Sequence, residues 1–258
     1  MAKENGKTTE TKAVGIIGGM GPMATVDLFR KIVMMTDASS DSEHLRIMID
    51  NRPEIPDRTA AILAGKDTPV SYILDSASRL AAMGADFLII PCNTSHCFFP
   101  AILEGSPIPV LNMIEETALR LQADGVKSVG LLATDGVLQV GVYDQVLAEH
   151  GIRTLRPSPA RQKEVMHIIY GEIKAGVSAH PEALEPLLGD MMLEGAEAFI
   201  LGCTELPLAF DGYTVGRERF YDPTAILAAA AIKYAGGAVR HGEYMHPEIR
   251  PSASAAVL

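Results

Sequence analysis

Two cysteines occupy equivalent positions in two similar segments of the chain, and this pairing is the strongest chemical signal in the sequence. The segment "GADFLIIPCNT" covers residues 84–94 and "GAEAFILGCTE" covers residues 195–205, and each cysteine follows its glycine by eight residues. A single cysteine after an apolar run is usually an inert small hydrophobe. Packing alone gives no reason for the position to recur, so Cys92 and Cys203 are candidates for a shared chemical role.

Both cysteines precede segments with a helical pattern, "NTSHCFF" after Cys92 and "TELPLAF" after Cys203. A thiolate at the start of a helix is stabilised by free backbone N–H groups and by the helix dipole. The same N–H groups, together with the hydroxyls of Thr94 and Thr204, can bind a carboxylate. The two segments therefore combine reactive thiols with donors for an acidic substrate.

Two facing thiols without a cofactor motif suit proton transfer at carbon. A thiolate on one face removes a proton, a thiol on the other face returns one, and the two exchange states with each turnover. The α-proton of an amino acid is so weakly acidic that fixed donors must also neutralise the substrate carboxylate. We expect this chemistry to need no cofactor and no metal.

The remaining cysteine gives a weaker signal. Cys97 has no counterpart in the second segment and lies beside "FF", so we expect it to pack in the core. Zinc binding by Cys92, His96, Cys97 and Cys203 is disfavoured because the C-x3-H-C spacing is not a usual ligand pattern.

The thiols must be positioned by an α/β framework, since short apolar strands alternate with helical patterns along the chain. Strands are predicted near 13–18, 45–50, 86–91, 108–111, 127–133, 152–155, 197–202 and 219–221, and helices over 22–36, 69–83, 112–124, 136–149, 160–175, 181–195 and 223–235. Near-continuous apolar strands indicate parallel sheets covered by helices on both faces. Ligands of open α/β sheets bind beyond the carboxyl ends of the strands, where this chain has "GGMGP", "NRPEIPDR", "PCNTSH", "ATDG" and "GCTE".

The similarity between the two halves extends beyond the cysteine segments. "AVGIIGGMG" (13–21) matches "SVGLLATDG" (128–136), and "PVLNMIEETAL" (109–119) matches the pattern of "RFYDPTAILAA" (219–229), in the same order. This duplication predicts two pseudo-symmetric α/β domains, each with a mainly parallel four-stranded sheet, and an active site in the cleft between them. We expect the first domain to comprise 13–111 and about 222–240 and the second to comprise 112–221, with tails at 1–12 and 241–258.

Composition excludes several classes of partner. Lys and Arg number 22 against 32 Asp and Glu, and the resulting net charge of −10 disfavours nucleic acid and anionic membranes. Three cysteines are an odd number and do not suggest a disulfide framework. The first residues, "MAKENGKTTETK", lead into no apolar signal segment, and no apolar run is long enough to span a bilayer. We expect a cytoplasmic protein with free thiols.

A set of motifs resembles one known family. These are "GIIGGMGP", "IPDRT", "ADFLIIPCNTSH", "MIEETA", "GLLATDG", "YGEIKAG" and "LGCTE". From about Ala13 to Gly236 the chain resembles the aspartate racemase branch of the aspartate/glutamate racemase superfamily, which racemises amino acids without pyridoxal phosphate. Glutamate racemases of cell-wall synthesis usually show "DSGxGG" and "GCTHYP" instead, and both are absent here.

The resemblance implies roles for individual residues and a homodimeric assembly. Cys92 and Cys203 become the two acid/base residues, and Arg58 and Lys174 become the cations that engage substrate carboxylates. Further residues implied to line the site are Met20, Asn93, Thr94, Thr134 and Thr204. Without the resemblance, Arg58 could be a solvated first-turn residue, and Lys174 could simply complement a helix dipole. A pair of cations suits a dicarboxylate better than a neutral amino acid.

Two residues and several functions stay open. His96 either tunes Cys92 or caps a helix, and Glu205 either belongs to a proton network or restrains the thiol of Cys203. The expected function is racemisation of aspartate or a related acidic amino acid. Alternatives are a broad-specificity amino-acid racemase, a maleate-type cis–trans isomerase of the same fold, and a non-catalytic amino-acid-binding sensor. A disulfide between Cys92 and Cys203 is disfavoured in a reducing cytoplasm.

Overall fold

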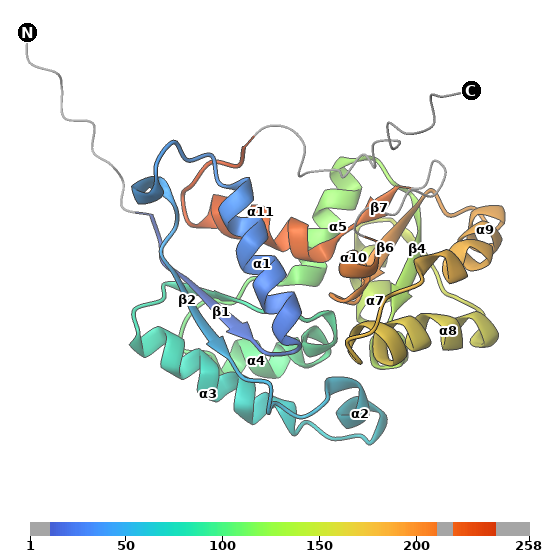
Figure 1. The fold of residues 1–258 in the computed structure, drawn as a ribbon, viewed down its shortest axis with the longest axis horizontal. Helices are drawn as coiled ribbons and strands as arrows, with labels where there is room; N and C mark the ends of the chain where they lie inside the picture. Colours follow the sequence, from blue (N-terminus) through green and yellow to red (C-terminus); the bar gives the residue numbers. More distant parts are fainter. Residues whose placement is uncertain (1–10, 211–218, 241–258) are drawn as a thin grey trace, which may run out of the picture.

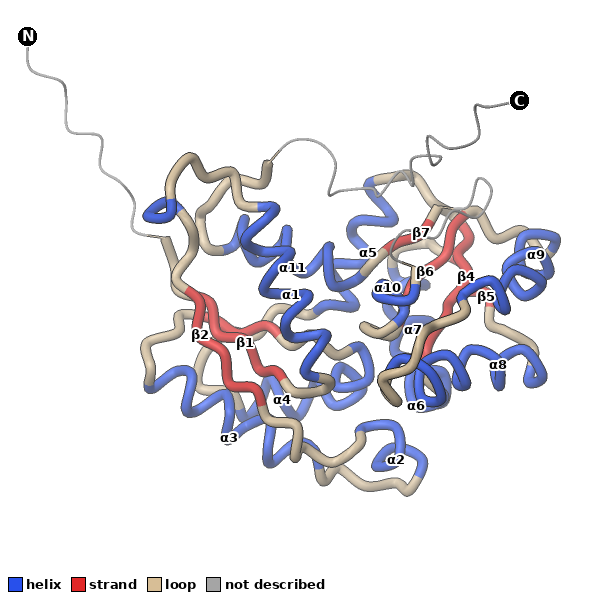
Figure 2. Tube along the Cα trace, in the orientation of Figure 1, coloured by secondary structure: helices blue, strands red, loops and turns tan. Residues whose placement is uncertain are grey.

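Two parallel sheets form the framework of the molecule, and each is flanked by helices (Figure 1). The computed structural model describes residues 11–210 and 219–240. Of the tails predicted at 1–12 and 241–258, residues 1–10 and 241–258 lie outside the described residues. We call the sheet that contains Cys92 and its helices the first lobe, and the sheet that contains Cys203 and its helices the second lobe; Figure 2 shows their strands in red, in two separate groups.

The first sheet has the strand order β2-β1-β3, with all strands parallel. Its strands are β1 (Val14–Gly18), β2 (Ile47–Asn51) and β3 (Phe87–Ile89). The fourth strand predicted at 108–111 is wrong for this sheet, because only an isolated parallel bridge joins Leu88 to Val110. Two hydrogen bonds flank the bridge, and pairing extends no further since the adjacent Pro107 and Pro109 have no backbone N–H to donate.

The second sheet has the order β5-β4-β6-β7 and is also fully parallel. Its strands are β4 (Ser128–Ala133), β5 (Arg153–Leu155), β6 (Ala198–Gly202) and β7 (Phe220–Tyr221). Strands β4, β5 and β6 take the same places as β1, β2 and β3 of the first sheet, and β7 takes the place of the bridge at Val110. The predicted α/β fold with two pseudo-symmetric units is confirmed.

Helices bury both faces of the first sheet. The helical segments of the first lobe are α1 (Pro22–Met35), the 3-10 segments η1 (Asp41–Glu43) and η2 (Asn93–Phe98), α2 (Arg58–Leu63), α3 (Pro69–Ala82), α4 (Phe99–Gly105) and α11 (Pro223–Tyr234). Of these, α1 and α11 cover one face and α3 and α4 the other. Along β1, Val14 and Ile16 point into the core shared with α1 and α11, while Ile17 points into the core shared with α3. This alternation is that of a strand buried on both faces.

The second lobe is covered in the same way. Its helices are α5 (Met113–Ala123), α6 (Asp135–Val140), α7 (Val142–Glu149), α8 (Pro159–Met166), the π-helical segment η3 (His167–Ile173), the 3-10 segment η4 (Pro181–Leu184), α9 (Glu185–Leu193) and α10 (Leu206–Ala209). The helix predicted over 136–149 is divided at Gly141, which has a left-handed φ of 71° and ends α6. The helix predicted over 160–175 changes from α- to π-helical geometry after Met166.

The last described helix belongs to the core of the first sheet. Leu227, Ala228 and Ile232 of α11 pack in one cluster with Val14 and Leu28, although more than half of the chain separates them in sequence. In Figure 1, α11 lies beside α1, between the two sheets. The domain limits given above stay a prediction. Within the described part of the chain, no helix has the length and apolar character needed to cross a bilayer.

Candidate active site

A small pocket lies between the loops that follow the strands of the two lobes. Its space amounts to about 250 Å³, part of it open to solvent. The lining residues are Met20, Asp57, Arg58, Thr59, Cys92, Asn93, Thr94, Thr134, Tyr170, Lys174, Cys203, Thr204 and Glu205. The structure thus brings together every residue expected to be catalytic or to contact substrate, and it adds Asp57, Thr59 and Tyr170.

Cys92 is held at the end of the first lobe's β3 by a buried, rigid turn. Its side chain is 5% exposed, and its extended backbone caps the 3-10 segment η2. The next residue, Asn93, accepts a 2.6 Å hydrogen bond from the buried hydroxyl of Tyr143 on α7. Because Tyr143 belongs to the second lobe, this contact fixes the Cys92 turn relative to the opposite wall of the pocket.

Arg58 brings a buried cation to the Cys92 side. It begins α2 directly after Asp57, whose Oδ1 accepts a 2.7 Å bond from the N–H of Ala60 as a helix cap. Its guanidinium donates to the carbonyls of Ile55 and Pro56 at 3.1 Å and to that of Met20 at 3.4 Å. Carbonyls fix the orientation of the guanidinium without neutralising its charge.

The guanidinium of Arg58 makes no ion pair with a carboxylate of the described residues. It forms no salt bridge there, and its Nε is buried without a hydrogen-bond partner. Burial acts to lower the pKa of Arg58, but interactions with Cys92 and then Asp57 outweigh this and raise the pKa above its usual value. The buried guanidinium therefore remains charged and lines the pocket, where a substrate carboxylate can reach it.

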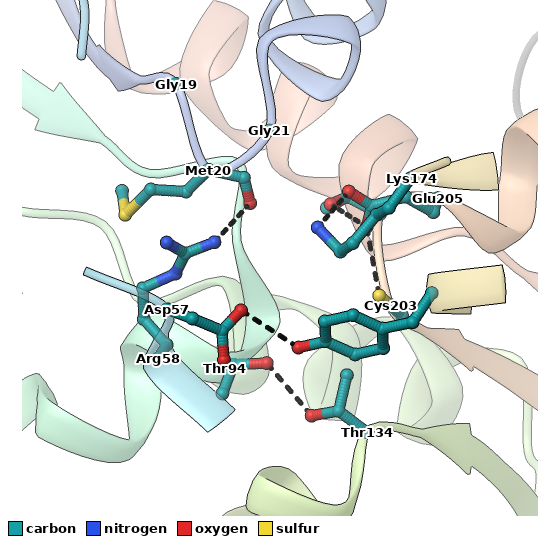
Figure 3. A network of polar contacts seen from close by, with 12 residues as sticks. Gly19, Met20, Gly21, Asp57, Arg58, Thr94, Thr134, Lys174, Cys203 and Glu205 are labelled. Carbon is teal, nitrogen blue, oxygen red and sulfur yellow. Dashed lines mark hydrogen bonds and ion pairs between the residues drawn. The ribbon is translucent and has the colours of Figure 1, made fainter. Parts of the chain in front are cut away.

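Cys203 has a different neighbour. Its Sγ lies 3.0 Å from Oε2 of Glu205, and the hydroxyl of Thr204 lies 3.2 Å from the same oxygen (Figure 3). The other carboxylate oxygen, Oε1, accepts a 2.6 Å bond from Nζ of Lys174. Burial, and then the charge of Glu205, raise the pKa of the Cys203 thiol well above its ordinary value, against the opposing effect of Lys174.

Tyr170 is a wall of the pocket that sequence reasoning missed. Its hydroxyl donates a 3.1 Å bond to Oδ2 of Asp57, which connects η3 of the second lobe to the start of α2 in the first. Nζ of Lys174 lies 5.6 Å from the Tyr170 ring centre, within the range of a cation–π contact. The "YGEIKAG" motif contained the signal, because residues four positions apart share one face of a helix.

The other lining residues connect the two lobes or shape the turn after β1. The hydroxyls of Thr94 and Thr134 lie 3.0 Å apart across the lobes, and Thr134 also caps α6. The side chain of Met20 accepts a 3.3 Å contact from the hydroxyl of Ser95. The preceding Gly19 has a φ of +92°, and a Cβ there would lie 2.3 Å from the backbone of Arg52, so the turn requires glycine.

His96 lies outside the pocket lining and acts as a helix cap. Its Nδ1 is 2.9 Å from the carbonyl oxygen of Cys92, and its Nε2 is 3.1 Å from the N–H of Met113, the first residue of α5. Since a carbonyl only accepts, Nδ1 carries the hydrogen and Nε2 accepts. Burial lowers the pKa of His96 to about 4, so the ring is neutral at pH 7. Its hydrogen bonds are with backbone, and its ring stacks on Phe99 at 5.5 Å between ring centres.

Cys97 lies against the core of the second lobe. It packs on the cluster that includes Val137 and Tyr143, and burial raises its pKa to about 12. A thiol of this kind is inert near neutral pH. Among residues 11–210 and 219–240, no cluster of three or more His, Cys, Asp and Glu side chains is arranged to hold a metal ion.

The arrangement is suited to acid/base chemistry on a small anionic molecule. Two thiols from opposite lobes line one pocket, and they differ in their nearest charged group: a guanidinium beside Cys92 and a carboxylate beside Cys203. Hydroxyls of Thr94, Thr134 and Thr204 lie among them. Such a pocket can bind a carboxylate and exchange a proton with the carbon next to it.

Comparison with known proteins gives a consistent assignment. A family model described as Asp/Glu/Hydantoin racemase matches residues 17–231. A solved structure of Picrophilus torridus aspartate racemase is 35% identical, has a TM-score of 0.76, and covers 90% of this chain and 97% of its own. An aspartate racemase homologue from Pyrococcus horikoshii OT3 is 25% identical, with a TM-score of 0.71 and coverage of 87% and 99%. The broad specificity amino-acid racemase RacX of Bacillus subtilis (strain 168) is 27% identical over 225 residues, which are 85% of this chain and 96% of RacX.

Proposed function

Since this chain belongs to the Asp/Glu/hydantoin racemase family and is an isomerase of the racemase type, we propose that it interconverts the L and D forms of aspartate, or of a related acidic amino acid, without a cofactor. The observation that carries the proposal is the shared pocket. Cys92 and Cys203 approach it from opposite lobes, and Arg58 and Lys174 line the same space. The two thiols supply a base and an acid on opposite faces of the substrate, and the cations supply recognition of carboxylates.

The proposed reaction moves one proton at a time. A thiolate removes the α-proton from one face of the bound amino acid, which breaks the Cα–H bond and leaves its electron pair on the substrate. The opposite thiol then donates its proton to the other face, which forms a new Cα–H bond and inverts the centre. The thiolate and the thiol have now exchanged states. After one turnover the enzyme is therefore in the protonation state that catalyses the reverse reaction.

The substrate carboxylate must hold the negative charge that develops during this exchange. Arg58 is suited to this role because its guanidinium is buried, charged and fixed by backbone carbonyls, with Nε unpartnered in the described structure. A guanidinium binds a carboxylate with two parallel hydrogen bonds, which also orients the α-carbon. We assign the α-carboxylate to Arg58 for this reason.

The second carboxylate of aspartate is assigned to Lys174. This lysine already makes an ion pair with Glu205 at 2.6 Å, so a substrate carboxylate has to share or replace that partner. The support for an acidic substrate is therefore the likeness to the Picrophilus torridus aspartate racemase together with the two cations of the pocket.

A broad-specificity amino-acid racemase is the second candidate, and one observation favours it. If Lys174 keeps Glu205 as its partner, Arg58 alone is open to a carboxylate, and an amino acid with a neutral side chain satisfies the site. The likeness to RacX points the same way. A maleate-type isomerase and a non-catalytic sensor remain outcomes of the test below. Homodimeric assembly and a cytoplasmic location stay predictions.

A deuterium-exchange assay tests the function. The purified full chain, treated with a chelator and free of pyridoxal phosphate, is incubated in D2O with each enantiomer of acidic and neutral amino acids and with maleate. NMR follows loss of the α-proton, and chiral chromatography follows inversion. The proposal predicts exchange and inversion of aspartate or a related acidic amino acid from both enantiomers. Exchange with neutral amino acids at similar rates would favour the broad-specificity reading, and no exchange with any amino acid would contradict a racemase.

A further inference from the structure

The two thiols of the pocket have different charged neighbours, and only the Cys203 thiol contacts the carboxylate of Glu205. We propose that Glu205 is a positioning residue that holds Cys203 in its thiol form, so that in the free enzyme Cys203 is the proton donor of the two-thiol pair. This inference rests on the proposed two-thiol mechanism for its catalytic meaning. It assigns a role to Glu205, which sequence reasoning left open between a proton network and a restraint.

The geometry around Glu205 requires donors. A carboxylate has only acceptor oxygens, so the 3.0 Å contact between Oε2 and Cys203 Sγ is a hydrogen bond in which the thiol donates. The hydroxyl of Thr204 donates to the same oxygen at 3.2 Å, and Lys174 donates to Oε1 at 2.6 Å. Glu205 is 5% exposed, so water replaces few of these contacts. A thiolate at Cys203 would face this buried carboxylate at contact distance, which like-charge repulsion opposes.

The charges that face the two sulfurs support the same assignment. Around Cys203 they are Glu205 and Lys174, with the neutral phenols of Tyr143 and Tyr170 farther away. Lys174 favours a thiolate there, but its charge is already shared with Glu205.

Around Cys92 the facing groups are Arg58, Lys174 and the neutral side chains of His96 and Cys97, and the charge of Asp57 acts on Arg58. Arg58 interacts directly with Cys92, and its guanidinium has no salt bridge in the described structure. The nearest charged group is thus a guanidinium without a salt bridge beside Cys92 and a carboxylate paired with Lys174 beside Cys203.

The consequence concerns the first step of catalysis. An enzyme that rests in this form binds productively the enantiomer whose α-proton points toward Cys92, and Cys203 donates to the opposite face. Glu205 then loses its donor when Cys203 gives up its proton, and the bond forms again when the thiol is restored. Glu205 acts through Cys203 and Lys174 and needs no contact with the reacting carbon.

Alkylation of the full chain at a series of pH values tests the proposal without requiring turnover. Iodoacetamide reacts with thiolates, and peptide mass spectrometry gives the rate at each cysteine separately. The pH midpoint of each rate reports proton affinity, whereas the plateau reports access. We expect the Cys203 midpoint to lie well above the ordinary thiol range. Cys97 should remain unreactive near neutral pH because burial raises its pKa to about 12.

The Glu205→Gln variant isolates the cause. It replaces an acceptor by an amide that can donate to a thiolate, so the midpoint of Cys203 should move down toward the ordinary thiol range, with a roughly tenfold gain in thiolate for each pH unit. The Cys92 midpoint should move much less. Glu164→Gln is the matched control, because Glu164 pairs with Arg161 on α8 outside the pocket lining and should leave both midpoints in place.

Several outcomes would overturn the proposal. One is a Cys203 midpoint within the ordinary thiol range in the unmodified chain, and another is a Cys203 midpoint that Glu205→Gln leaves unchanged. If Glu205→Gln does not fold, Glu205→Asp keeps the charge on a shorter side chain and should lower the Cys203 midpoint by a smaller amount; no movement would again refute the role. A chain that shows the expected midpoints but no racemisation would contradict the proposed function and leave this inference standing.

Discussion

Cys92 follows β3 in the first lobe, and Cys203 follows β6 at the corresponding place in the second. The backbone treats them alike: each thiol is 5% exposed, comes directly after a buried parallel strand region and precedes a short helical segment. The side chains around them differ, with a guanidinium on one side and a carboxylate on the other. Duplication of the fold therefore supplies two thiols in one pocket, and divergence of a few neighbours gives each thiol a different charged neighbour.

The loops after the two cysteines differ as well. His96 joins the Cys92 turn to the start of α5 through two backbone contacts, and it stays neutral. On the other side, Glu205 joins the Cys203 turn to Lys174 through an ion pair. One turn is thus held by a buried neutral ring outside the pocket, and the other is held by charges inside it.

The largest effect should come from removing either thiol. Cys92→Ala and Cys203→Ala are each expected to lower the rate of racemisation by about 10³-fold or more, at the upper end of what one acid/base group contributes. Chiral chromatography of each enantiomer measures the loss. Cys97→Ala is the control and should stay within a factor of about two, since Cys97 lies against the core. If one of the two variants kept most of its activity, catalysis would not require both thiols.

Replacing the cation beside Cys92 should lower kcat/KM more than replacing the cation beside Cys203. Arg58→Ala is expected to lower kcat/KM by about 100-fold, because a hydrogen-bonded charge in a buried site contributes roughly 1.5–3 kcal/mol. Lys174→Met should cost about tenfold, since Lys174 spends part of its charge on Glu205. Arg58→Lys, which keeps the charge and loses the fork, should fall between them. A greater loss for Lys174→Met than for Arg58→Ala would reverse the assignment of the α-carboxylate.

The buried neutral ring of His96, which joins the Cys92 turn to the start of α5, predicts a pH dependence of the free energy of unfolding. In the folded chain its pKa is about 4, against 6.5 in the unfolded chain, so the unfolded state gains a proton that the folded state does not. The contribution is fully present above pH 6.5 and is lost as the pH falls toward 4, by about 2 kcal/mol at pH 5. Urea unfolding at pH 7 and pH 5 should show that His96→Asn lacks this loss, with other titrating groups cancelling in the difference. If both proteins lost the same free energy of unfolding between pH 7 and pH 5, a buried neutral His96 ring would be ruled out.

The smallest effect should come from the bond that joins the lobes over the pocket. Tyr170→Phe removes the donor to Asp57 and is expected to raise KM by a few-fold with little change in kcat, as a neutral hydrogen bond contributes about 0.5–1.5 kcal/mol. Steady-state kinetics on both enantiomers would measure it. Tyr72→Phe, a half-exposed residue on α3, serves as the control. A loss in kcat alone would mean that Tyr170 takes part in the chemistry.

Local sequence patterns predicted the framework and the composition of the pocket. Apolar runs bounded by polar turns located β1 and β6, and the repeated glycine-to-cysteine spacing located both thiols. These features were predictable because strand burial and strand-end loops are encoded within about ten residues of sequence. The short helix α2 was not among the predicted helices, because its six residues are too few for a periodic pattern.

Features that depend on contacts between distant segments were not predictable. The Tyr170–Asp57 bond joins residues that are 113 positions apart, and the Lys174–Glu205 pair joins residues that are 31 apart. Neither has a local signature. The π-helical geometry that carries Tyr170 was likewise hidden, because its apolar spacing reads as an ordinary helix. The pairing of Lys174 with Glu205 also changed the substrate argument, which had counted both cations as free for a dicarboxylate.

Deuterium exchange in variants that lack either Cys92 or Cys203 tests the central claim most directly. Cys92→Ala and Cys203→Ala are each incubated in D2O with pure L- and pure D-aspartate, and NMR follows the α-proton of each sample. If one thiol faces each side of the α-carbon, each variant should exchange the α-proton of only one enantiomer, without inverting it, and the two variants should act on opposite enantiomers. Exchange of the same enantiomer by both variants, or of both enantiomers by either one, would contradict a mechanism with one thiol on each face.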